Sequence, residues 1–164
     1  MKEKWPMKSQ ETGSWCGPAC VQEVLRNLLK KEVSQKDLAE LMKTTLEDGT
    51  THEQMLKGIK CFGLNAYATT ETSLDVLNLV VKTGSVVIIN WMSGKDIKED
   101  GHYSILESSG KETVEINNPG YPIWNNGERG SYNTLRRQDF EANWFDVEKN
   151  EKTVRNWALI VSVV

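Results

Sequence analysis

The sequence has 164 residues, of which 38% are hydrophobic and 26% are charged, and its formal net charge is −3. These values are ordinary for a soluble globular protein, so they exclude wholesale disorder and argue against nucleic acid as a partner. No apolar run approaches the roughly 20 residues of a membrane span, and residues 1–7 lack the apolar centre of a signal peptide. We therefore expect one domain over residues 1–164, cytoplasmic by default unless a leader has been removed.

The first predicted helix follows the sequence Cys-Gly-Pro-Ala at positions 16–19. Apolar residues recur at helical spacing from Val21 to Leu29. Pro18 fits only the first turn of such a helix, which places Cys16 at the helix N-terminus. The opposite side carries the polar residues and is expected to face solvent: Gln22, Glu23, Arg26, Asn27 and Lys30.

Two further helices are predicted before the first strand. Ser34 is a candidate N-cap for the second helix, which is expected to bury Leu41 together with other apolar residues of that segment. A third helix is expected after Thr50, where Glu53 stands at the position that completes a capping box. The first half of the chain is therefore predicted to be mainly helical.

The pattern then changes to segments rich in β-branched and aromatic residues, which is typical of strands. Strands are expected over residues 64–69, 85–91, 103–108, 113–117 and 157–163, with helices over 74–82 and about 139–144 and a surface loop over 120–130. Helices followed by mostly adjacent strands indicate the α+β class, with an N-terminal helical layer packed on a C-terminal antiparallel sheet.

The three cysteines, Cys16, Cys20 and Cys61, form neither a disulfide scaffold nor a zinc knuckle, so at least one thiol is free. A helix N-terminus favours the thiolate over the thiol, because its amide dipoles present partial positive charge. Cys16 is therefore the candidate nucleophile. Cys20 and Cys61 are expected to be buried and inert.

A nucleophilic thiol needs a base, and the sequence contains only two histidines. His52 lies in the first turn of a predicted amphipathic helix and is expected at the surface. His102 opens a predicted strand, and a hairpin turn centred on Gly110 would place it directly opposite Asn118. An asparagine there could accept the ring proton of the histidine and orient it, although Asn118 also belongs to an Asn-Pro-Gly turn signal.

Gln10 is a candidate donor for an oxyanion hole, because the segment between it and Cys16 can fold back beside the helix start. Taken singly, each of these residues has a plainer interpretation: a buried small side chain for Cys16, a satisfied sheet residue for His102, a turn residue for Asn118 and a surface amide for Gln10. Their combination favours acyl transfer through a thiolate.

Four motifs in this order resemble those of the papain-like cysteine peptidases that process bacteriocin leader peptides. They are Gln10-x5-Cys16-Gly-Pro-Ala, Gly-His102-Tyr-x-Ile-Leu, Ile-Asn-Asn118-Pro and Phe140-x3-Trp144. The resemblance implies a papain-like fold in which Cys16 is the nucleophile, His102 its base, Asn118 the orienting residue and Gln10 the oxyanion donor. That family usually has aspartate where this chain has Asn118, and Cys-His-Asn is also a known papain-like triad.

Members of that family are commonly fused to membrane transporters, and this sequence contains no transporter segments, so we expect a stand-alone peptidase without an implied double-glycine leader substrate. A peptide or protein is the expected substrate, with no metal and no organic cofactor. Trp15, Tyr103 and Trp124 are expected near the cleft. Two alternatives remain: a thiol acyltransferase of the transglutaminase kind with the same triad, and a catalytically silent peptide-binding module on the same scaffold.

Overall fold

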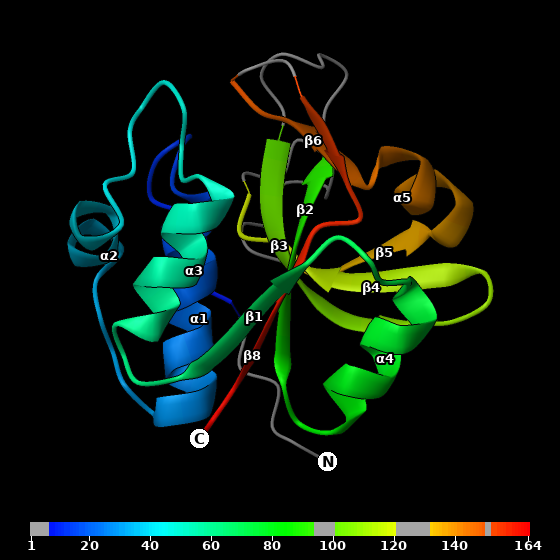
Figure 1. Cartoon of the computed structure of the whole chain (residues 1–164), viewed down its shortest axis with the longest axis horizontal. Helices are drawn as coiled ribbons and strands as arrows, with labels where there is room; N and C mark the ends of the chain where they lie inside the picture. Colours follow the sequence, from blue (N-terminus) through cyan, green and yellow to red (C-terminus); the bar gives the residue numbers. More distant parts are fainter. Residues whose placement is uncertain (1–6, 94–100, 121–131, 150–151) are drawn as a thin grey trace.

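The computed structural model describes residues 7–93, 101–120, 132–149 and 152–164. A helical layer lies on one side of a six-stranded antiparallel sheet, and two further helices cover the other side (Figure 1). The helical layer consists of α1 (Cys16–Leu29), α2 (Gln35–Leu41) and α3 (His52–Lys60), and the far side carries α4 (Leu74–Lys82) and α5 (Arg137–Asn143). The predicted α+β class is therefore confirmed.

The sheet has the strand order β1-β8-β2-β3-β4-β5, with every neighbouring pair antiparallel. Its strands are β1 (Asn65–Thr69), β2 (Val86–Met92), β3 (Gly101–Ser109), β4 (Thr113–Asn117), β5 (Tyr132–Arg136) and β8 (Ala158–Ser162). A separate two-stranded sheet pairs β6 (Phe145–Val147) with β7 (Thr153–Arg155). The sequence pattern did not predict β5, β6 and β7, two of which have only three residues.

Side chains alternate across the central strands and build a separate core on each face of the sheet. In β2, Ile88 packs into the core under the helical layer, whereas Val87 and Ile89 pack into the core under α4 and α5. All three side chains are fully buried. Because both faces of β2 are buried, its sequence is a continuous apolar run rather than an alternation of apolar and polar residues.

The polar side of α1 is not exposed as expected. Gln22 and Glu23 are only 4% and 2% exposed. The segment before α2 and the first residue of α2 contact Gln22. The Gln22 amide donates to the Val33 carbonyl at 2.7 Å, and the Glu23 carboxylate accepts from Arg26 at 3.0 Å. Burial raises the pKa of Glu23, while Arg26 opposes that shift. Partners brought by the fold therefore make polar burial possible.

Three local predictions need correction. The capping box of α3 joins Thr51 with Gln54 rather than Thr50 with Glu53, so the helix begins one residue later than its sequence signal indicated. Leu41 is 46% exposed instead of buried. Cys61 is exposed instead of buried, because it follows the last residue of α3. The predicted surface loop lies mostly outside the described residues, as does Trp124.

The register of the β3–β4 hairpin also differs from the prediction. Ile105 pairs with Asn117 and Leu106 with Ile116, and a bulge then shifts the ladder near the turn. Because β3 continues to Ser109, the turn is displaced toward β4 and is closed by the Gly110 N–H donating to the Thr113 carbonyl at 2.8 Å. The predicted direct pairing of position 102 with position 118 is therefore wrong by two residues.

Within the described residues, no helix has both the length and the apolar composition that crossing a membrane requires.

Candidate active site

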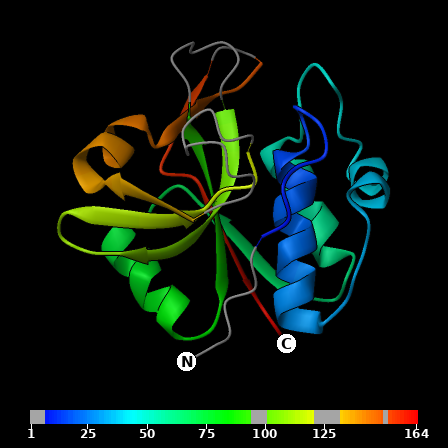
Figure 2. The same cartoon turned by 180° about the vertical axis from the view of Figure 1, so that it is seen from behind.

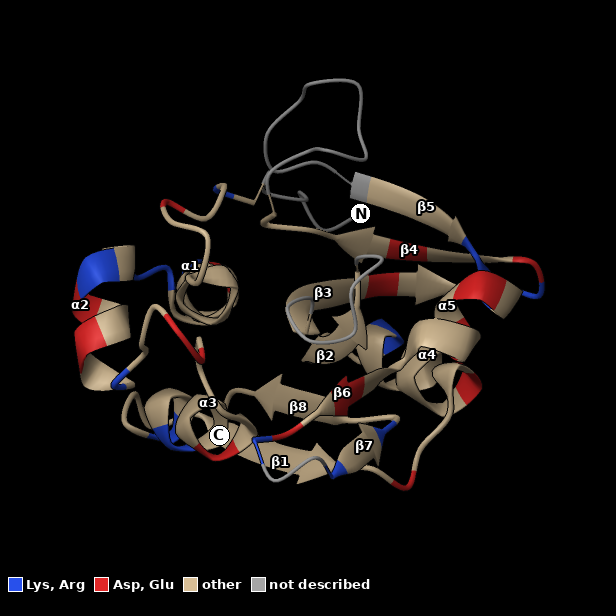
Figure 3. Ribbon diagram, turned by 90° about the horizontal axis from the view of Figure 1, so that it is seen from above, with Lys and Arg blue, Asp and Glu red and all other residues tan. Residues whose placement is uncertain are grey.

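Cys16 is the first residue of α1, a helix that packs beside β3 (Figure 3). Its side chain is 8% exposed, so it sits just below the surface. The helix has no side-chain N-cap and no acidic residue in its first turn. The partial positive charge of the helix N-terminus is thus not neutralised there by a carboxylate, which favours an anion at this position.

The thiol of Cys16 forms a hydrogen bond with His102. Burial alone raises the pKa of Cys16, but the hydrogen bond and positive charge of His102 oppose it, together with backbone hydrogen bonds at Tyr103 and Gly17. The net effect lowers the pKa below the ordinary value of a cysteine. The lowered pKa favours the thiolate of Cys16, which is the reactive form of a cysteine side chain.

His102 also contacts Asn118, with 2.6 Å between the ring Nε2 and the amide Oδ1. The Gly120 N–H donates to the same Oδ1 at 2.8 Å, which identifies that atom as the oxygen. We infer that Nε2 carries the proton shared with Asn118, and that Nδ1 is the nitrogen left for Cys16. A Cβ at Gly120 would lie 2.9 Å from Asn118 Oδ1 and 3.1 Å from His102 Nε2, so the pair requires glycine there.

The Trp91 ring contacts His102, and the sequence did not predict this contact. Trp91 lies opposite His102 in the β2–β3 ladder, and the two rings meet edge to face with their centroids 6.3 Å apart. The indole N–H of Trp91 donates to Ser104 Oγ at 3.0 Å, which fixes the ring. A tryptophan at the end of a predicted strand is a weak signal by itself, because only the register places it against the histidine.

Gln10 lies close to the turn that carries Asn118, within the N-terminal segment that runs beside α1 before this helix begins (Figure 2). Its backbone N–H donates to the Pro119 carbonyl at 2.8 Å. The side chain is 5% exposed, and its Nε2 donates to the carbonyls of Thr12 at 2.8 Å and Gly13 at 3.1 Å. Action as an oxyanion donor therefore requires Nε2 to give up or share one of these loop contacts.

Tyr103 was expected near the cleft, but its ring is 3% exposed and its hydroxyl donates to the Thr50 carbonyl at 2.8 Å. It joins β3 to the segment before α3 and stabilises the contact between the sheet and the helical layer. Burial raises the pKa of Tyr103 well above its ordinary value, so the hydroxyl stays protonated and acts as a donor. Trp15 is half-buried as the N-cap residue of α1.

His52 is not the surface residue that its place on α3 suggested. Its side chain is 12% exposed, and its ring stacks on Trp157 with centroids 4.2 Å apart. The ring Nε2 lies 3.4 Å from Asp146 Oδ2. Burial lowers the pKa of His52 from 6.5 to about 4, so the ring is neutral near pH 7 and the contact with Asp146 is not an ion pair there.

Acidification is therefore expected to destabilise the fold through His52. The unfolded chain takes up a proton near pH 6.5, whereas the folded chain resists it down to about pH 4, so stability falls as the pH drops through this window. Between pH 7 and pH 5 the loss from this residue is about 2 kcal/mol. Asp146 has the opposite effect on stability. Burial raises its pKa, so the folded state takes up a proton on this carboxylate more readily than the unfolded chain does. Urea unfolding at both pH values should show a smaller pH dependence in His52→Gln, and an unchanged dependence would contradict the assignment.

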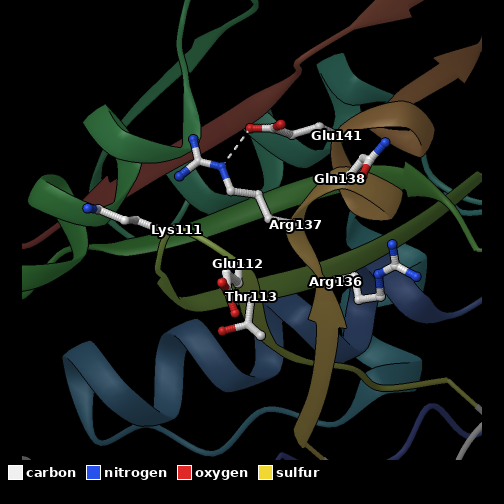
Figure 4. Close-up of a pocket in the computed structure, with 7 residues that line it drawn as sticks. All are labelled: Lys111, Glu112, Thr113, Arg136, Arg137, Gln138 and Glu141. Carbon is white, nitrogen blue, oxygen red and sulfur yellow. Dashed lines mark hydrogen bonds and ion pairs between the residues drawn. The ribbon is translucent and has the colours of Figure 1, made fainter.

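A surface pocket of about 590 Å³ lies away from Cys16, at the turn between β3 and β4 and the start of α5 (Figure 4). Its charged side chains are partly paired: Arg137 contacts Asp75 and Glu141, each at 2.8 Å. This pocket contains none of the four predicted site residues. Among the described residues there is also no group of three His, Cys, Asp or Glu side chains that could hold a metal ion.

The described geometry can be compared with known proteins. The model of the Peptidase C39 family matches residues 4–148. No curated protein matches the sequence at a significant level. Among solved structures, the peptidase domain of Streptococcus ComA, described as a bifunctional ABC transporter involved in quorum sensing, is 18% identical with a TM-score of 0.74, and the match covers 98% of this chain and 100% of that one.

A C39-like peptidase from Bacillus anthracis is 17% identical with a TM-score of 0.73, and the match covers 97% of this chain and 94% of that one. A double-glycine-motif protease from an AMS/PCAT transporter, crystallised with a leader peptide, is 18% identical with a TM-score of 0.66, covering 98% and 93%. At these identities the structural likenesses establish the fold, whereas the family model covers most of the sequence. The chain therefore belongs to the Peptidase C39 family and is a papain-like cysteine peptidase.

Proposed function

We propose that this peptidase cleaves peptide bonds with Cys16 as nucleophile, His102 as acid and base, Asn118 as the residue that orients His102, and Gln10 as an oxyanion donor. The observation that carries the proposal is the continuous hydrogen-bonded row Cys16–His102–Asn118, in which the pKa of the thiol is lowered despite its burial. Such a row has the three roles of a catalytic triad: nucleophile, base and orienting group.

In the first half-reaction the Cys16 thiolate attacks the peptide carbonyl carbon, and the carbonyl oxygen becomes an oxyanion. The backbone N–H of the nucleophile and the Gln10 amide are the proposed donors to that oxygen. The His102 imidazolium gives its proton to the amine as the carbon–nitrogen bond breaks, which leaves a thioester on Cys16. In the second half-reaction His102 takes a proton from water, the hydroxide attacks the thioester, and the carboxylic acid and the thiolate are released.

The proposed substrate class is a peptide, or a segment of a protein that is extended or locally unfolded. The leader-peptide complex of the double-glycine-motif protease supports this proposal, because that protein shares the fold. Cys16 lies just below the surface, where the helical layer meets the sheet. A peptide with small side chains at the scissile bond could approach it there. The two glycines of a leader peptide have that property, and they are one case within this class.

The test is digestion of a proteome-derived peptide library by the parent protein and by Cys16→Ala, with products identified by mass spectrometry. We expect cleavage by the parent and none by the variant. The same digest with a primary amine added separates hydrolysis from acyl transfer, because transfer leaves the amine on the new C-terminus. Equal cleavage by the two proteins, or products that all carry the amine, would overturn the proposal.

The role of Asn118 predicts a graded effect of substitution. Asn118→Asp is expected to retain most activity, because a carboxylate can also accept the His102 ring proton and the Gly120 N–H. Asn118→Ala leaves the ring without an acceptor and should be slower by up to about 10,000-fold, the loss seen when the orienting residue of a catalytic triad is disabled. Steady-state kinetics on one cleaved peptide, with thermal unfolding as the control for fold, checks this. Equal rates for both variants would reduce Asn118 to a turn residue.

A further inference from the structure

The start of β3 is packed tightly against a carboxylate from another element. Gly101 is the first residue of β3 and directly precedes His102. A Cβ on Gly101 would lie 2.5 Å from Asp146 Oδ1, closer than real Cβ contacts, and 3.3 Å from its Cγ, which is tighter than most. Glycine at this position of β3 therefore makes space for the carboxylate.

Asp146 is itself held from two sides. Its Oδ1 accepts a hydrogen bond from the Val147 N–H at 2.8 Å, and its Oδ2 lies 3.4 Å from His52 Nε2. The His52 ring is in turn fixed by stacking on Trp157. The carboxylate can therefore move away from Gly101 only by giving up the Val147 N–H or by pushing against a ring that the helical layer holds in place.

The described strand pairing reaches the first residues of β3 from one side. On one side β2 pairs with them, through Met92 with Gly101 and Trp91 with His102. On the other side the ladder to β4 begins only at Ile105, four residues after the start of β3. The strand β6, which carries Asp146, contacts both β2 and β3. It thus packs on the part of β3 that β4 does not reach.

We propose that Asp146 is a positioning residue for His102: its carboxylate supports the backbone at Gly101, and His52 on α3 supports the carboxylate from the helical layer. The inference rests on the proposed role of His102 as the base. The same contact joins the layer that carries Cys16 to the strand that carries His102. It thereby helps to set the distance between thiol and imidazole, for which a displacement of about 1 Å can cost about 100-fold in rate.

A double-mutant cycle tests this contact. Gly101→Ala is expected to lower kcat by about 100-fold with little change in KM, because the new methyl group displaces the backbone before His102. In the double variant Gly101→Ala/Asp146→Ala the methyl group has room, so kcat should be at least about tenfold higher than in Gly101→Ala. A difference of that size lies within the coupling energies found for residues in contact. Asp146→Asn keeps the shape and the acceptor for the Val147 N–H, so it should remain close to the parent.

Glu148→Gln is the matched control, since Glu148 directly follows β6, lies 3.8 Å from His52 Nδ1 and is 42% exposed. It should leave kcat unchanged. A double variant no faster than Gly101→Ala would overturn the proposal. A loss in Asp146→Asn as large as in Asp146→Ala would also overturn it, by showing that the charge matters rather than the contact. Circular dichroism and thermal unfolding of every variant confirm that the fold is retained before rates are compared.

The pH midpoint of Cys16 alkylation provides a second readout that does not require a substrate. It should rise in Gly101→Ala and return toward the parent value in the double variant, because it reports the distance from thiol to imidazole. If the parent cleaves no peptide, the proposed function fails, while this alkylation cycle still decides whether Asp146 positions His102. If cleavage depends on Cys16 and His102 but the cycle shows no coupling, only the positioning role fails.

Discussion

Replacing His102 with alanine is expected to remove nearly all peptide cleavage and to raise the pH at which Cys16 reacts with iodoacetamide. A positioned acid and base contributes about 100- to 10,000-fold to the rate of such a reaction. The hydrogen bond and charge of His102 oppose the burial of Cys16, which by itself raises the pKa of the thiol. Without His102, burial is opposed only by the backbone and the helix N-terminus, so the pKa of Cys16 should rise.

The measurement is site-resolved alkylation between pH 4 and pH 10, with each cysteine followed by mass spectrometry. Cys61 is exposed and serves as the internal reference, whereas Cys20 is fully buried with a pKa raised by that burial and should react last. Cys16 should react at a lower pH than Cys61 in the parent and lose that advantage in His102→Ala. If Cys16 and Cys61 react with the same pH dependence in both proteins, Cys16 is not an activated nucleophile. The catalytically silent peptide-binding module then becomes the better interpretation.

Replacing Gln10 with alanine is expected to lower kcat by about 100- to 1,000-fold, which is the usual cost of losing one oxyanion donor. The donor serves the transition state, so KM should change little. The two loop hydrogen bonds of Gln10 are also lost, which costs stability by about 1 kcal/mol and is measured separately by urea unfolding.

Gln138→Ala is the control for Gln10→Ala, because Gln138 is an exposed glutamine on α5. Its kcat should equal that of the parent. A Gln10→Ala variant that also keeps the parent rate would remove Gln10 from the oxyanion hole. In that case its buried amide serves only to hold the loop before α1, through the Thr12 and Gly13 carbonyls.

Features that depend on neighbouring residues could be predicted without the structure. Pro18 fits only the first turn of a helix, and α1 does begin at Cys16. The helix over Leu74–Lys82 and the strand over Thr113–Asn117 have the predicted bounds, because a cap or turn residue and a regular apolar pattern agree at both. The order of helices and strands follows from the same local rules, and with it the α+β class.

The burial of particular polar residues depends on how the layers pack and could not be predicted from local sequence. Gln22 on α1 and His52 on α3 lie on faces that periodicity assigns to solvent. Gln22 is covered from the next helix and the segment before it, and His52 by Trp157, which is distant in the sequence. Burial of a polar group is favourable only where partners satisfy or shield it. Those partners, such as Gln35 for the first residue and Trp157 for the second, are set by how the layers pack.

The approach of His102 to Asn118 also depends on the tertiary structure. The predicted hairpin register was two residues off, because the length of β3 and its bulge are not encoded by the turn residues alone. The two side chains nevertheless meet, since Asn118 lies beyond the end of the ladder, where the Gln10 N–H holds the turn through Pro119. Spacing in the sequence therefore identified the residues, and packing of the N-terminal segment against the hairpin determined how they meet.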